Sequence, residues 1–176
     1  MKRLTVVTGM LALALAISAT AAEKKNHFYL GAGLALPNGD FGDAYKMGLH
    51  AEGGYGFQVS PKLEIVPTVA FHTFGFDDNG TGASGDALNI IMFGGNAKLN
   101  FGTEGKKTNP FVYGGLGMAN GKSGGASSTD LYFSAGGGLD IVSSEAMSFF
   151  AKAGFVSVSS DGASTTYLPV TFGVRF

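Results

Sequence analysis

The chain has 176 residues and a formal net charge of -1, which gives no reason to expect nucleic acid as a partner. Its composition, 45% hydrophobic and 14% charged, argues against intrinsic disorder, and the absence of cysteine excludes a disulfide framework. Glycine supplies 29 residues, about twice the usual share, which favours strands and turns with close backbone approach.

Residues 1–22 are predicted to be a secretory signal peptide. Lys2 and Arg3 give a positive start, an apolar run covers 6–17, and "SATAA" supplies the small residues of a cleavage site. A transmembrane helix fits less well because the apolar run is short for a bilayer. Cleavage at this site would export residues 23–176 as a single domain.

Beyond the signal, no stretch approaches about 18 consecutive apolar residues, so a membrane-spanning helix is not expected. Apolar residues instead alternate with small or polar ones in short runs, the pattern of transmembrane β-strands. The eight runs cover 28–36, 46–57, 62–76, 87–101, 110–119, 131–142, 147–158 and 166–176.

The connections between these runs fall into two classes. Those after the first, third, fifth and seventh runs are rich in Gly, Ser, Asp and Asn, whereas those after the second and sixth are tight. Long outer loops that alternate with short periplasmic turns are typical of outer-membrane barrels. The connection over 102–109 is longer than this pattern predicts.

Alternation also assigns the charged residues to one face of the strands. In the second run, His50 and Glu52 share a face opposite Leu49 and Ala51, for example. An eight-stranded barrel is just wide enough for side chains to fill, so this face predicts a buried ionic and hydrogen-bonded network. The predicted lumen residues are His50, Glu52, Lys98, Asp140, Lys152 and Arg175.

A soluble barrel would invert these faces, and the alternation itself is compatible with both arrangements. The export signal and the aromatic C-terminus favour an apolar face toward lipid. Aromatic residues near strand ends could form interfacial girdles, namely Tyr55, Phe57, Phe101, Phe149 and Phe176. The lipid-facing sides of the first and fifth runs stay open, and Pro67 and Pro169 each require a bulge or an unpaired position.

The opening "YLGAGLALPNGDFGDAYKMG", the strands "GGLGMA" and "SAGGGLDI", and the closing "LPVTFGVRF" resemble the small outer-membrane barrels of the OmpA-type and opacity-type superfamily. The resemblance implies an all-β fold: an eight-stranded antiparallel up-and-down transmembrane β-barrel, monomeric in the cell outer membrane, in contact with outer-membrane lipid and lipopolysaccharide. It also implies that the last strand closes the barrel against the first and presents a signal to the barrel assembly machinery. That signal comprises Val170, Phe172, Val174 and Phe176.

The predicted outer connections are acidic. Their aspartates are Asp40, Asp43, Asp77, Asp78, Asp86, Asp130 and Asp161. One hypothesis is that these carboxylates coordinate divalent cations that bridge to lipopolysaccharide phosphates, since oxygen ligands suit Ca²⁺ and Mg²⁺. The alternative is that Asp and Gly serve here only as turn formers.

The expected role is therefore structural or surface-interacting, without a catalytic, cofactor or metal site. The alternatives are an outer-membrane lipid-modifying enzyme, a narrow pore, and a soluble exported barrel that binds a ligand. His72 could serve as a general base, but no serine follows at the short spacing of the lipid A deacylase motif. His50 with Glu52 supplies too few ligands for a metal.

Overall fold

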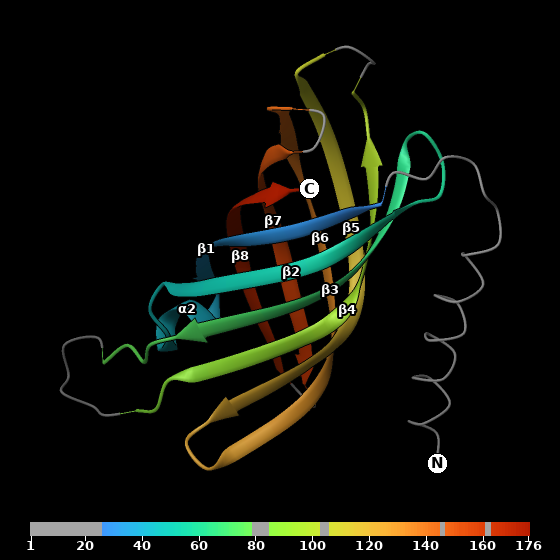
Figure 1. The fold of residues 1–176 in the computed structure, drawn as a ribbon. Coiled ribbons are helices and arrows are strands. Elements are labelled where there is room, and N and C mark those ends of the chain that lie inside the picture. The colour runs from blue at the N-terminus through green and yellow to red at the C-terminus, as the bar shows by residue number, and fades with distance from the viewer. Residues whose placement is uncertain (1–25, 79–84, 103–105, 145–146, 161–162) are drawn as a thin grey trace, which may run out of the picture.

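The computed structural model describes residues 26–78, 85–102, 106–144, 147–160 and 163–176. Within these residues, eight antiparallel strands pair in sequence order and close into a barrel, as predicted (Figure 1). The elements are β1 (His27–Asn38), α2 (Asp40–Ala44), β2 (Gly48–Gln58), β3 (Leu63–Phe74), β4 (Leu88–Asn100), β5 (Thr108–Ser123), β6 (Ala126–Val142), β7 (Ser148–Ser160) and β8 (Ala163–Arg175). The predicted signal peptide lies outside the described residues. No described helix has the length and apolar character to cross a membrane.

The wall of the barrel is apolar on its outer face. In β2, for example, Leu49 is 61% exposed whereas its neighbour His50 is buried. The strands whose orientation the sequence left open follow the same rule. Leu30 of β1 and Val112 of β5 point outward, whereas Tyr29 and Phe111 are buried inside. The charged face therefore lines the interior, and the outer face is suited to lipid.

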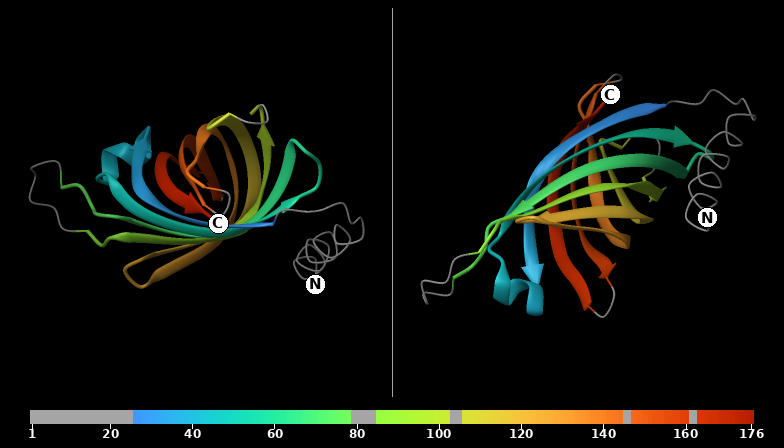
Figure 2. Two further views of the ribbon diagram at one scale, coloured as in Figure 1. Left: turned by 45° about the horizontal axis from the view of Figure 1, so that its top comes forward. Right: turned by 90° about the horizontal axis from the view of Figure 1, so that it is seen from below.

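The first and last strands close the barrel, as the C-terminal alternation predicts. Ten residue pairs join β1 to β8, from Tyr29 opposite Arg175 to Asn38 opposite Thr166. Beyond them, Phe28 N–H donates to Phe176 O at 2.6 Å, and Phe176 N–H donates back to Phe28 O at 3.1 Å. Figure 2 shows the closed wall from two further directions.

One predicted outer loop is wrong. Residues 120–130 were expected to form a long connection, but β5 continues to Ser123 and β6 begins at Ala126. Gly124 and Gly125 alone join the two strands, and Gly124 adopts the left-handed φ of 56° that a two-residue hairpin favours. The side chain of Asn120 stabilises the hairpin across the strands, donating to Ser128 O at 3.2 Å and Thr129 Oγ1 at 2.8 Å. The hairpin projects at the lower left of Figure 1.

The two strand prolines that the sequence singled out, Pro67 and Pro169, each face an interruption in one ladder, as expected for residues without an N–H. Pairing between β2 and β3 skips from Gly54 opposite Thr68 to Phe57 opposite Ile65, which leaves Pro67 out. Pairing between β7 and β8 likewise resumes beyond Pro169. The register is the same on both sides of each gap, so each proline is unpaired on one side only and does not lie at a bulge.

Inward-facing glycines make room for two large tyrosine rings. A Cβ on Gly136 would lie 2.8 Å from Tyr113 Cε1 and 2.7 Å from the Cα of Gly154. A Cβ on Gly117 would lie 2.7 Å from Tyr132 Cε1. Glycine at these positions is therefore required by close packing inside the narrow bore, not by the backbone conformation.

We expect Gly136→Ala to destabilise the barrel by about 1–3 kcal/mol, because overpacking forces rigid backbone and ring atoms apart. Gly114→Ala is the matched control: it lies on the outer face, and its Cβ would have Ser134 O as its nearest neighbour at 3.9 Å. Far-UV circular dichroism during urea unfolding in lipid vesicles measures both variants. Equal unfolding midpoints would contradict the packing role.

Candidate functional site

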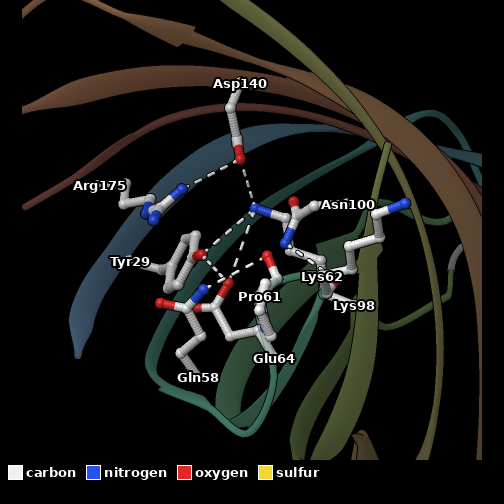
Figure 3. Close-up of polar contacts among 9 residues, drawn as sticks. All are labelled: Tyr29, Gln58, Pro61, Lys62, Glu64, Lys98, Asn100, Asp140 and Arg175. Atoms are coloured by element: carbon white, nitrogen blue, oxygen red, sulfur yellow. Dashed lines mark hydrogen bonds and ion pairs between the residues drawn. The ribbon is translucent and has the colours of Figure 1, made fainter. Parts of the chain in front are cut away.

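A buried ionic cluster (Figure 3) occupies the interior at the end of the barrel where β1 begins and β8 ends. Lys98 Nζ lies 2.6 Å from Asp140 Oδ2, and Arg175 Nη1 lies 3.2 Å from the same oxygen. Lys98 Nζ also donates to Tyr29 Oη at 3.2 Å, and Tyr29 Oη donates to Glu64 Oε2 at 2.6 Å. Four other strands, β1, β3, β6 and β8, thus contribute side chains to the cluster around the Lys98 ammonium group.

The cluster is largely buried and electrically balanced. The side chains of Lys98 and Asp140 are 5% and 1% exposed, and two acids face two bases because Glu64 Oε2 lies 4.0 Å from Lys98 Nζ. The Lys98 ammonium also stands 4.2 Å from the centroid of the Phe111 ring. Charges removed from water need such partners, so the arrangement is held by mutual compensation.

A second ion pair crosses the middle of the lumen. Lys152 Nζ lies 2.6 Å from Glu52 Oε1, which joins β7 to β2, and the ammonium stands 4.9 Å from the centroid of the Tyr113 ring. Two cavities of about 40 Å³ each include both members of this pair in their linings. Each cavity has room for water molecules but not for an organic ligand.

Histidines form the next layer. His50 Nε2 is hydrogen-bonded to Thr171 Oγ1 at 2.9 Å, and the His50 and His72 rings stack at 5.1 Å between centroids. His72 also meets the Tyr167 ring at 5.1 Å, and Tyr167 Oη donates to the sulfur of Met92 at 3.1 Å. This layer marks the transition from the charged part of the lumen to an apolar part.

An apolar plug fills the remaining end of the barrel. Helix α2, which follows the left-handed Gly39, turns Phe41 inward until it is 7% exposed. The Phe41 ring packs 4.9 Å from that of Phe74 and 6.3 Å from that of Tyr167. The buried cluster around them comprises Ala35, Phe41, Ala70, Phe74, Ile90, Met92, Ala119, Tyr132, Val156, Val158 and Tyr167. The sequence predicted a turn-rich connection here and missed the helix.

The structure places all six sequence-predicted lumen residues on the inner face, but in separate groups. Lys98, Asp140 and Arg175 meet in one cluster, Glu52 and Lys152 form another pair, and His50 bonds to Thr171 instead. Three partners were missed, namely Tyr29, Glu64 and Thr171. The alternation of side chains along a strand would have identified Glu64 as an inward residue, because it lies an even number of residues before His72 and so shares its face.

The aspartates of the predicted outer connections do not gather at one place. Asp77 and Asp78 lie 3.7 and 3.8 Å from Lys46 Nζ, and Asp130 belongs to β6, where it accepts a hydrogen bond from Ser160 Oγ at 3.0 Å. Placing Asp130 in an outer loop was therefore wrong, since the paired hairpin extends past it. Asp40 and Asp43 lie in α2, Asp86 precedes β4, and Asp161 falls outside the described residues. Among the described residues, no three His, Cys, Asp or Glu side chains gather into a metal-binding group.

Outward aromatic residues gather at the end that holds the termini. The Phe28 ring lies 4.7 Å from that of Tyr55 and 6.2 Å from that of Phe176. The predicted assembly residues Val170, Phe172, Val174 and Phe176 all lie along the outer face of the last strand, and Phe172 is 66% exposed. Recognition of these residues by an assembly machinery stays a prediction.

Comparison with known proteins gives a consistent family and fold. The family model of the outer membrane protein beta-barrel domain matches residues 8–176. Neisserial surface protein A (NspA) is similar at a TM-score of 0.69 and 15% identity, over 88% of this chain and 98% of that one. No curated protein matches the chain.

Two further solved structures are similar in fold. The N-terminal β-barrel domain of Pseudomonas aeruginosa OprF gives a TM-score of 0.53 at 19% identity, over 88% of this chain and 100% of that one. Ail, the attachment invasion locus protein of Yersinia pestis, gives a TM-score of 0.52 at 15% identity, over 88% of this chain and 100% of that one. At such identities the likeness concerns the fold alone.

We expect Asp140→Asn to destabilise the barrel by about 3–5 kcal/mol, because it leaves the Lys98 and Arg175 charges buried without their shared carboxylate. Asp86→Asn, at an exposed position, is the control and should change stability by less than about 0.5 kcal/mol. Urea unfolding in vesicles checks both. If the two variants unfold at the same urea concentration, the cluster does not stabilise the barrel.

Proposed function

Because the chain belongs to the family of outer membrane protein β-barrel domains, we propose that it is an exported, monomeric and non-enzymatic barrel of the outer membrane. Its role is structural, supporting outer-membrane integrity, with a polar hairpin available for surface contacts. The outward Phe, Leu and Val side chains would face lipid acyl chains, and the outer end would face lipopolysaccharide.

The filled interior carries this proposal. From one end to the other, the lumen holds the Lys98 cluster, the Glu52–Lys152 pair, the stacked histidines and the Phe41 plug. Eight strands leave a bore that side chains can fill, and here they fill it with paired charges and packed rings. This arrangement supports a mechanical element of the membrane over a diffusion channel.

The geometry offers little support to the other candidates. His72 is 4% exposed and its ring neighbours are His50, Phe74 and Tyr167, so a lipid substrate would have no route to it as a base. A soluble ligand-binding barrel would need an apolar interior of several hundred Å³. The two interior cavities of about 40 Å³ are far smaller.

Surface contact is supported by the projecting β5–β6 hairpin. Pairing with β7 ends at Leu131 opposite Ser159, so residues 126–129 of β6 run beyond the described part of that ladder. These residues are small, uncharged and exposed. An edge without lysine, proline or a bulge can accept a further strand from a partner protein.

The first test measures the electrophoretic mobility of the protein in SDS and its ion conductance in planar bilayers. We expect the protein in the outer-membrane fraction, with a band that shifts on boiling because a closed barrel resists SDS until heated. Planar bilayers should show no steady ion current, with a 16-stranded porin as the positive control. Recovery in the soluble periplasmic fraction, or a stable porin-like current, would overturn the proposal.

A second test separates the structural role from surface contact. In a strain that lacks the protein, we expect increased sensitivity to EDTA and bile salts, restored by wild type. A variant in which residues 121–128 are replaced by Asn-Gly should restore resistance equally, since the turn suits a two-residue hairpin and the wall stays intact. Loss of resistance in this variant, with normal surface amounts, would assign the role to the hairpin instead.

A further inference from the structure

The outer wall over β1 to β4, the strands nearest the viewer in Figure 1, contains a hollow of about 480 Å³. Gly53 and Pro67 contribute to its lining. Large apolar side chains surround them, namely Phe28, Leu30, Tyr55, Val69 and Phe93. Most of these flanking side chains are about half exposed, so the hollow opens to whatever surrounds the barrel.

Sequence and pairing explain why the wall is hollow here. Gly53 has no side chain to cover the sheet, and Pro67 falls where the β2–β3 ladder is interrupted. The neighbouring positions carry long side chains, and the Phe28 and Tyr55 rings meet edge to face at 4.7 Å on one side. The depression therefore follows from small residues flanked by large ones, without any distortion of register.

The charges at this end of the barrel indicate the chemistry of the occupant. The aromatic cluster of Phe28 and Tyr55 lines one part of the hollow, and Val69 and Phe93 line another. Just beyond that cluster lie the turns after β2 and β4, whose described charged side chains are Lys62, Lys106 and Lys107. A ligand with an apolar chain and an anionic head group complements both features.

We propose that this hollow binds one acyl chain of a membrane phospholipid, whose phosphate lies at the level of Lys62. The inference rests on the proposed insertion of the barrel in the outer membrane, which places the hollow in hydrocarbon. The chain packs over Gly53 and Pro67, and the aromatic rings hold the glycerol region at the interface. The lipid thereby fills the depression in the outer wall.

The test uses the full barrel in vesicles of phosphatidylglycerol and phosphatidylethanolamine, extracted in mild detergent for native mass spectrometry. Wild type should retain one phospholipid. Gly53→Phe should retain at least about tenfold less, because losing the burial of even two methylene groups weakens binding that much. A Cβ on Gly53 would meet Leu30 Cδ2 at an ordinary 3.4 Å, so the variant should fold.

The control is Gly114→Phe, an outward glycine of β5 outside the hollow, which should retain lipid like wild type. Lys62→Gln should reduce retained phosphatidylglycerol several-fold, whereas Lys122→Gln on the distant hairpin should not.

Equal retention in wild type, Gly53→Phe and Gly114→Phe, or no retention at all, would overturn the lipid site while leaving the barrel function intact. A dimer mass lost only in Gly53→Phe would assign the hollow to a second copy and also overturn it. Failure to insert into the vesicles would overturn the proposed function itself.

Discussion

The narrow bore of an eight-stranded barrel is the constraint on which the rest of this structure depends. Every second residue of every strand points into a space that only side chains can fill. Large rings such as Tyr113 fit there because glycines face them, as Gly136 does. Charged side chains fit there only in compensating groups, such as Lys98 with Asp140. The high glycine content and the ion pairs are therefore two responses to the same restriction.

The same restriction divides the interior into layers. Charged residues occupy the end that holds the termini, whereas Phe41, Phe74 and Tyr167 pack together at the other. The histidine pair lies between them, where the Tyr167 ring meets His72 edge to face on one side and Thr171 bonds to His50 on the other. Each layer pairs its own charged groups, although Glu64 Oε1, Asp140 Oδ1 and Arg175 Nε have no hydrogen-bond partner among the described residues. The layers together make the barrel a filled cylinder.

The alternation of residues in the sequence predicted which side chains face the lumen, but it could not predict which of them contact one another. The alternation around Lys98 and Asp140 places both inside, yet their pairing depends on the stagger across two intervening strand junctions, which parity does not contain. The lipid-facing side of the first strand could not be predicted, because its glycines and alanines do not divide into a polar and an apolar face. The predicted loop over 120–130 failed because Gly, Ser and Asn are turn formers that also tolerate pairing once a two-residue turn sets the register. Helix α2 is too short for periodicity to reveal.

Because the interior is filled and electrically balanced, a specific binding site is to be sought on the outer surface of the barrel. The lumen charges are paired with one another, which supports a structural role for them over recognition of a solute. The exterior has two features of interest: residues 126–129 of β6 run beyond the described part of the β6–β7 ladder, and the β2–β3 ladder is interrupted beside Pro67. In the proposed membrane orientation, the hairpin presents backbone groups above the membrane, and the surface beside Pro67 presents apolar side chains within it. These two places differ in chemistry, so a protein strand suits one and a lipid chain suits the other.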